Sequence, residues 1–181
     1  MEFALWASPA RPWPETLAHA RWARDRGFAQ LWFADHLMPH RPDDAPDDGE
    51  LHECWTTLAG VGALVPDLDL VSMVSPTTWH HPVLLLKRAV EVDHLSGGRA
   101  VLGLGAGWQV NEHAAYGLDL GSAKVRVDRF AEAIEIISRL RTEERVDVAG
   151  EHFTLMSAPL SPKPIGSLPL VVGTSGPRMP A

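Results

Sequence analysis

The sequence lacks the features of several protein classes. Its one cysteine, Cys54, cannot form a disulfide within the chain, which fits a reducing compartment. Its 16 lysines and arginines stand against 23 acidic residues, so it lacks the basic excess that nonspecific nucleic-acid binding requires. No apolar run reaches the ~18 residues of a membrane span, and the N-terminus lacks the basic and apolar regions of a signal peptide. We therefore expect a cytoplasmic protein without nucleic-acid or membrane partners.

Strand-like and helix-like segments alternate along the 181 residues. The expected strands are Phe3–Ala7, Gln30–Ala34, Leu68–Val74, Ala100–Leu104 and Pro169–Val172. The expected helices are Pro14–Arg26, Glu53–Leu64, Pro82–Leu95 and Val125–Leu140, and a hairpin is expected over Val146–Val148 and His152–Leu155. This alternation predicts an α/β fold with a parallel sheet, which fits either a doubly wound sheet or part of a (β/α)₈ barrel.

The most distinctive stretch is Gly97–Trp108, GGRAVLGLGAGW, where glycines alternate with apolar residues at the end of an expected strand. Glycine serves where the backbone turns sharply or approaches another group closely. A dinucleotide-binding G-x-G-x-x-G does not fit, because Trp108 or Val110 stands at the third glycine position. A methyl-donor loop is not favoured, because Gly103 replaces its acidic residue. A purely structural glycine turn stays open on local evidence.

Clusters of polar residues or glycine follow four of the expected strands: Ala34–His36, Ser72–Thr77, Gly105–Trp108 and Gly173–Gly176. The carboxyl ends of parallel strands meet at one edge of a sheet, where α/β proteins bind their ligands. The four clusters together therefore predict a ligand site at that edge.

Two other features raise the question of a metal site. The side chains of His80 and His81 point apart in either regular structure, and no cysteine or carboxylate spacing completes a ligand set. The acidic loop around Asp43 and Asp48 lacks the spaced ligands and glycine hinge of a calcium loop. No metal site is expected.

The motifs resemble those of the bacterial luciferase-like family of flavin and deazaflavin oxidoreductases. The matching runs are FADHLMP, VSPTTWHHP, DHLSGGRAVLGLGAGWQVNEHAAYGLDL, RVDRFAEAIEIISRL and PLVVGTSGP, and the resemblance extends from about Phe3 to Arg178. It implies a (β/α)₈ barrel of the TIM type with the cofactor at the carboxyl ends of the strands. The glycine pattern is most similar to members that use coenzyme F420, and members that use FMN share much of it.

The resemblance implies a catalytic role for His36, as the histidine that faces the reactive part of the ring and transfers a proton. Cofactor contacts are implied for Asp35, Ser72, Met73, Ala106, Gly107, Trp108, Gly173, Thr174, Ser175 and Gly176. Of these, Gly173–Gly176 would bind a phosphate through backbone N–H groups and hydroxyls. A non-prolyl cis peptide bond is expected between Ser72 and Met73. Many F420-using members have Glu at the position of Trp108, so this chain departs from them where they have an acid.

One luciferase-like oxidoreductase domain is expected over residues 1–181, with about the first five β/α units of the barrel and strands six to eight absent. A homo-oligomer, or a partner chain that completes the barrel, is therefore expected. The predicted reaction is hydride transfer between C5 of F420 and a small-molecule organic substrate. An FMN-dependent monooxygenase, which incorporates molecular oxygen, and a non-catalytic binding or assembly subunit are the alternatives.

Overall fold

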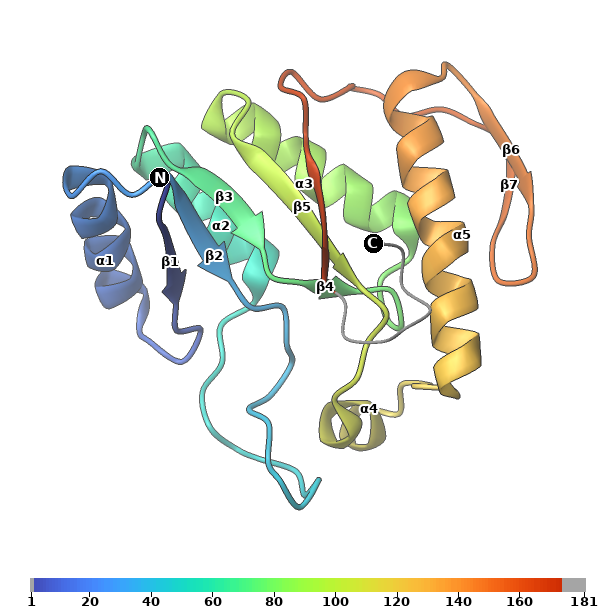
Figure 1. The fold of residues 1–181 in the computed structure, drawn as a ribbon, viewed down its shortest axis with the longest axis horizontal. Helices are drawn as coiled ribbons and strands as arrows, with labels where there is room; N and C mark the ends of the chain where they lie inside the picture. Colours follow the sequence, from blue (N-terminus) through green and yellow to red (C-terminus); the bar gives the residue numbers. More distant parts are fainter. Residues whose placement is uncertain (1, 174–181) are drawn as a thin grey trace.

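A computed structural model describes residues 2–173 of the chain, and Met1 and residues 174–181 lie outside the described part. Its strands form one parallel sheet (Figure 1), made of β1 (Ala4–Ala7), β2 (Gln30–Phe33), β3 (Asp69–Ser72), β4 (Ser75–Pro76), β5 (Ala100–Gly105) and β8 (Leu170–Gly173). Neighbours pair in the order β1-β2-β3-β5, and β8 pairs with the far side of β5. The predicted parallel α/β architecture is confirmed.

The helices follow the strands and begin and end at recognisable residues. They are α1 (Trp13–Asp25), α2 (Cys54–Leu64), α3 (Pro82–Ser96), the short α4 (Val110–Tyr116) and α5 (Ala123–Thr142). The side chain of Ser122 accepts a hydrogen bond from Val125 N at the start of α5. Gly97 ends α3 in the left-handed conformation, with φ 74°, which glycine adopts without steric cost.

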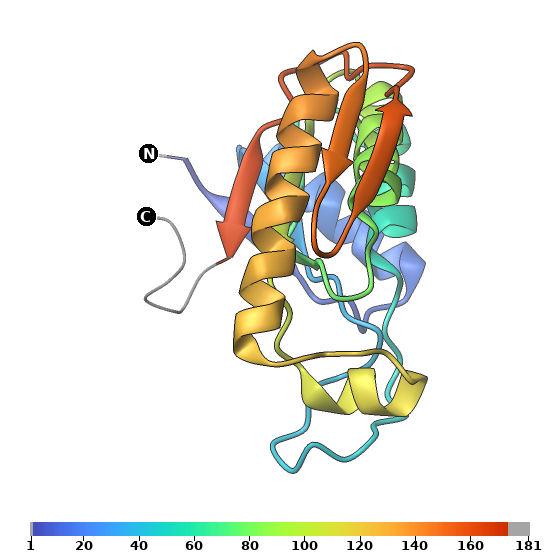
Figure 2. The same ribbon diagram turned by 90° about the vertical axis from the view of Figure 1, so that its right-hand side faces the viewer.

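One face of the sheet packs against the helices, which lie on a single side of it (Figure 2). Alternate strand residues such as Leu31, Leu70 and Leu102 are fully buried between the sheet and α1, α2 and α3. The opposite face presents Trp6 and Trp32, whose ring centroids are 6.4 Å apart, and Trp6 is 61% exposed. The hydrophobic core therefore lies on the helix side of the sheet.

The predicted hairpin is present as β6 (Val146–Ala149) and β7 (Thr154–Ala158), which pair antiparallel. The carboxylate of Glu132 on α5 accepts hydrogen bonds from the backbone N–H groups of Glu151, His152 and Phe153. These bonds fix the turn of the hairpin against α5.

Two details of the predicted elements were wrong. The strand expected over Leu68–Val74 is interrupted: β3 ends at Ser72, and β4 begins at Ser75 beside the end of β5. The helix α4 was not predicted, because its short sequence does not show a repeated helical spacing of apolar residues. Both differences lie at the carboxyl edge of the sheet, which is where the site was expected.

Candidate functional site

The carboxyl ends of the strands meet at the lower edge of the sheet in Figure 1, together with α4 and the long segment after β2. His36 follows β2, Met73 and Val74 follow β3, and Ala106–Trp108 follow β5. Gly173 ends β8, while Thr174, Ser175 and Gly176 lie outside the described residues. The parallel topology therefore places the described candidate residues at one edge.

The non-prolyl cis peptide bond joins Met73 to Val74, so the expectation of a cis bond between Ser72 and Met73 was wrong by one residue. Ser72 is still part of β3, in register with Phe33. The chain leaves strand geometry only after that pairing ends, so the cis bond falls in the gap between β3 and β4.

The glycines of the distinctive stretch make room for Val74. A Cβ atom on Gly105 would lie 2.7 Å from Val74 Cγ2, and one on Gly173 would lie 2.8 Å from the same atom. Leu102 and Leu104 face the helix core, so Gly103 and Gly105 face the other side of the sheet. Val74 therefore lies over the glycines on the face that the helices do not cover.

Gly107 needs to be glycine for two reasons. Its φ is 86°, in the left-handed region, and a Cβ atom there would lie 2.7 Å from Thr78 Oγ1. Ala106 and Gly107 are partly exposed beside Trp108, which is 56% exposed. The backbone of this turn is therefore open to a ligand.

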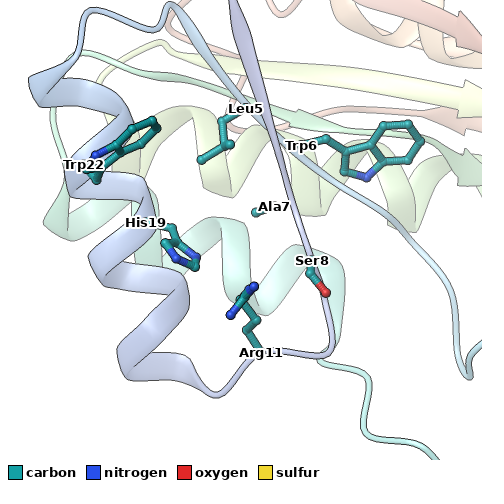
Figure 3. A pocket seen from close by; sticks show the side chains of 7 residues that line it. All are labelled: Leu5, Trp6, Ala7, Ser8, Arg11, His19 and Trp22. Atoms are coloured by element: carbon teal, nitrogen blue, oxygen red, sulfur yellow. The ribbon is translucent and has the colours of Figure 1, made fainter.

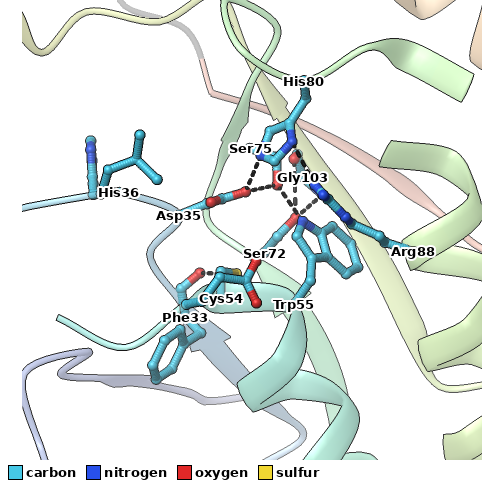
Figure 4. A network of polar contacts seen from close by, with 12 residues as sticks. Phe33, Asp35, His36, Cys54, Trp55, Ser72, Ser75, His80, Arg88 and Gly103 are labelled. Atoms are coloured by element: carbon cyan, nitrogen blue, oxygen red, sulfur yellow. Dashed lines mark hydrogen bonds and ion pairs between the residues drawn. The ribbon is translucent and has the colours of Figure 1, made fainter. Parts of the chain in front are cut away.

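Asp35 lies at the centre of a buried polar network (Figure 4). Its Oδ2 accepts hydrogen bonds from Ser75 Oγ at 2.5 Å and from His80 Nε2 at 2.9 Å. Arg88 Nη1 donates to His80 Nδ1 at 3.0 Å, and Trp55 Nε1 donates to Ser75 Oγ at 3.0 Å. Because the carboxylate is 3% exposed and its partners are inside the protein, Asp35 holds the end of β2 in place. Its contact with a cofactor stays a prediction.

Cys54 lies near the same network, with Sγ donating to Phe33 O at 3.5 Å. Burial raises the pKa of this thiol well above its usual value, and the charge of Asp35 acts in the same direction. The thiol is therefore a packing group rather than a nucleophile.

His36 points away from the Asp35 network (Figure 4) and pairs instead with Glu112 of α4. His36 Nδ1 lies 2.9 Å from Glu112 Oε1, and the backbone N–H of Leu37 donates to Glu112 Oε2 at 2.8 Å. The His36 side chain is 23% exposed, whereas that of Glu112 is 1% exposed. His36 thus combines a buried anionic partner with access to solvent.

Trp108 stands between two histidine rings. Its ring centroid is 5.6 Å from that of His36 and 4.9 Å from that of His40, both in edge-on arrangements. The indole therefore borders His36 at the open side of the site.

The polar side chains of α4 and of the residue before it are buried and hold the loops of the site. Gln109 Nε2 donates to Met38 O, and Asn111 Nδ2 donates to Pro39 O, both at 2.9 Å. His113 Nε2 lies 2.8 Å from Thr78 Oγ1. Sequence reasoning missed this group, including Glu112. The available signal was the polar run QVNEH directly after the glycine turn.

The cavity between β1 and α1 is a separate feature (Figure 3). It has a volume of about 480 Å³, and its lining includes Leu5, Arg11, His19 and Trp22. None of the described candidate residues lines it, so it is not the predicted site. Within residues 2–173, no helix is both long and apolar enough to cross a membrane.

Comparisons with known proteins give matches along the whole chain. The chain is 34% identical over 165 residues to the F420-dependent hydroxymycolic acid dehydrogenase of Mycobacterium tuberculosis, covering 90% of this chain and 44% of that protein. It is 32% identical over 179 residues to the F420-dependent glucose-6-phosphate dehydrogenase of Nakamurella multipartita, covering 98% of this chain and 51% of that protein. The chain thus spans about half the length of these relatives.

Solved structures share the fold. An F420-dependent secondary alcohol dehydrogenase, solved with an F420-acetone adduct, superposes with a TM-score of 0.83 at 23% identity, covering 94% of this chain and 51% of that one. The F420-dependent tetrahydromethanopterin reductase from Methanopyrus kandleri gives a TM-score of 0.82 at 20% identity, covering 97% and 51%. The sheet and helices described above therefore correspond to about half of a luciferase-like barrel. Since the family model of the luciferase-like monooxygenases matches residues 1–181, the chain belongs to that family.

Proposed function

We propose that this chain forms the F420-binding part of an oxidoreductase that transfers a hydride between the deazaflavin and an organic substrate. The observation that supports it most is the carboxyl edge of the sheet (Figure 1), where the ends of β2, β3 and β5 lie together and are followed by His36, by Met73 and Val74, and by the Gly107 turn. The relatives named above are F420-dependent dehydrogenases, at up to 34% identity. Hydroxyl compounds, such as secondary alcohols and sugar phosphates, are therefore the first substrates to test.

The residues present fit a planar ring of this kind. Gly103, Gly105 and Gly173 have no side chains, so on this face of the sheet only Val74 projects above the backbone of these strands. Met73 and Val74 are partly exposed there. We infer that Met73 and Val74 would hold the ring, together with Ala106, Gly107 and Trp108. Asp35 and Ser72 support these residues from inside the protein, and the phosphate contacts proposed for Gly173–Gly176 complete the assignment.

In this proposal the chain's own residues orient the substrate and move its proton. When bound, the deazaflavin supplies a carbon that accepts or gives a hydride. Among the described residues, His36 has a hydrogen-bond partner at Nδ1 only, so its Nε2 would accept the proton of the substrate hydroxyl. The ring of Trp108 lies edge-on to that of His36, at 5.6 Å between centroids.

FMN-dependent oxygenation is the second candidate. A monooxygenase from Streptomyces bottropensis superposes with a TM-score of 0.78 at 23% identity, covering 95% of this chain and 53% of that one. The same strand edge would bind the isoalloxazine ring of FMN. The two candidates differ in cofactor, so a binding measurement separates them.

The assembly of the site is part of the proposal. Trp6 is exposed on the face without helices, and β1 is an edge strand of the described sheet. We propose that a second copy or a partner chain covers this face. Sedimentation of the purified chain tests this, and a stable monomer would argue against it. The cytoplasmic location also remains a prediction.

Titration of the purified chain with F420 and with FMN, followed by the fluorescence of each cofactor, tests the proposed function. Preferential binding of F420, weakened in Gly107→Val, is the expected result. Leu64→Ala serves as the matched control, because Leu64 is exposed at the end of α2, outside the site. Preferential binding of FMN would favour the second candidate, and binding of neither would overturn both for this chain.

A further inference from the structure

The pairing of Glu112 with His36 suggests how the reactive nitrogen of the histidine is selected. The two side chains come from segments 76 positions apart in the sequence, and their atoms lie 2.9 Å apart. Both oxygens of the carboxylate are used, one by His36 Nδ1 and the other by the backbone N–H of Leu37. Glu112 therefore holds both the ring of His36 and the main chain directly after it.

A carboxylate accepts hydrogen bonds and does not donate them. With Leu37 N–H donating to Oε2, the contact at Oε1 assigns the proton of His36 to Nδ1. A neutral imidazole has one donor and one acceptor nitrogen, and the partner of one nitrogen decides the role of the other. Nε2 is then the nitrogen with the free lone pair.

The position of Glu112 is enforced by its surroundings. Gln109, Asn111, Glu112 and His113 are each at most 2% exposed. Gln109 and Asn111 bind the carbonyls of Met38 and Pro39, in the same segment that Glu112 binds at Leu37. Gln109 and the first turn of α4 thus bind three successive residues after His36, which leaves the carboxylate little freedom to move away from the imidazole.

We propose that Glu112 is the positioning residue of the site: it fixes His36 as the Nδ1–H tautomer and so presents Nε2 to the substrate. This inference rests on the proposed function for its catalytic meaning, but the tautomer itself is a property of the chain alone. It also explains how the chain works without an acid at position 108, because the proton passes through His36 rather than through a carboxylic acid at that position.

The first test is a nitrogen-15 NMR measurement of the His36 ring in the purified chain, with His36→Gln used to assign the signals. The expected result is a proton on Nδ1 and none on Nε2 at a pH where the ring is neutral. A proton on Nε2 with a bare Nδ1 would overturn the proposal. Because this measurement uses the unchanged chain, it tests the proposal even if variants of Glu112 fail to fold.

The second test compares Glu112→Gln with Asn111→Ala. Glutamine has only one acceptor oxygen for the two donors, so the His36 signals should show a mixture of tautomers. Asn111→Ala removes two neighbouring hydrogen bonds to the same loop, to Pro39 O and Ala45 O, and should keep the Nδ1–H tautomer. Equal tautomer populations in the two variants would show that α4 acts only as a structural support and would overturn the proposal.

Activity gives a separate readout once F420 turnover with a secondary alcohol or a sugar phosphate is measured. Glu112→Gln should lower kcat by about tenfold or more, since general acid–base catalysis contributes about 10²–10⁴-fold, and it should leave KM within about twofold. Asn111→Ala should lower kcat less. An unchanged kcat in Glu112→Gln would refute the proposal that Glu112 positions His36 for catalysis. Absence of F420 binding together with the expected tautomer would refute the proposed function and leave the assigned geometry intact.

Discussion

The hydroxyl of Ser72 binds both backbone groups of Gly103: it accepts from Gly103 N at 3.0 Å and donates to Gly103 O at 3.1 Å. The backbone pairing of β3 with β5 ends just before this point, at Val71 and Val101. The side chain thus continues the link between the two strands where the main chain of β3 turns away. Ser72 fixes the point from which Met73 and Val74 leave the sheet.

This contact predicts a large effect of Gly103→Ala. A Cβ atom there would lie 1.8 Å from Ser72 O, a backbone atom that cannot move without displacing β3. We expect the free energy of unfolding in urea to fall by about 3 kcal/mol, at the upper end for overpacking.

The control is Gly27→Ala, where φ is 76° and a Cβ atom would meet no neighbour within 4 Å. Left-handed backbone alone costs alanine about 1 kcal/mol. Equal losses in the two variants would show that the close approach to Ser72 has no energetic weight.

The buried Asp35–His80 pair predicts coupled effects on stability. His80 Nδ1 accepts from Arg88 and its Nε2 donates to Asp35, so the imidazole is a neutral donor to a buried carboxylate. Removing a partner of a buried charged group costs about 3 kcal/mol, so His80→Ala should lower the free energy of unfolding by about that amount. Asp35→Asn should recover part of that loss in the His80→Ala background, because the unpaired charge is removed. Strictly additive losses in a double-mutant cycle would contradict the coupling.

The exposed pair Arg41 and Asp43 predicts a local titration. The hydrogen bond from the Arg41 guanidinium, at 2.9 Å, and the bond from Ala45 N lower the pKa of the Asp43 carboxyl from 3.8 to about 2. A lowered folded-state pKa stabilises the fold above the unfolded value, and the contribution is lost as the pH falls from 3.8 towards 2.

Carbon-13 NMR of the Asp43 carboxyl should therefore show a midpoint near 2 in the unchanged chain. Arg41→Gln should move that midpoint towards 3.8. Since both side chains are exposed, added salt should weaken the shift. A midpoint that does not respond to Arg41→Gln would exclude the guanidinium as the cause.

Trp108 predicts a fluorescence signal for occupancy of the site. Its indole is 56% exposed, so acrylamide should quench it readily in the chain alone. A ring bound beside Gly107 would cover the indole and protect it from acrylamide. The part of the quenching that comes from Trp108 is the part that disappears in Trp108→Phe, and F420 should reduce that part. Equal protection by F420 in the unchanged chain and in Trp108→Phe would place the cofactor elsewhere.

Much of the fold could be predicted from the sequence, because the signals are local. Apolar runs between turn residues marked the strands of the parallel sheet, and apolar residues at helical spacing marked the helices, such as α3 and α5. The position of His36 at a strand end follows from the same alternation.

The arrangement within the site could not be predicted, because it depends on contacts between distant segments. Glu112 acquires its role only when α4 folds back onto the loop after His36. The same holds for Asp35, whose partners Ser75 and His80 lie 40 and 45 positions away. The cis bond was misplaced because the end of the β2–β3 pairing, and not the residue types, decides where the strand breaks.

Val74 also couples the substitutions that three glycines can accept. Gly103, Gly105 and Gly173 come from two strands, and each would place a Cβ atom within 3.0 Å of a Val74 side-chain atom. A methyl group gained at Gly105 or Gly173 requires a smaller residue at position 74, whereas one at Gly103 would also lie 1.8 Å from the backbone oxygen of Ser72. A larger residue at position 74 requires that all three stay glycine. Positions 105 and 173 can therefore change only after position 74 has become smaller, while Gly103 is kept in addition by the main chain of β3.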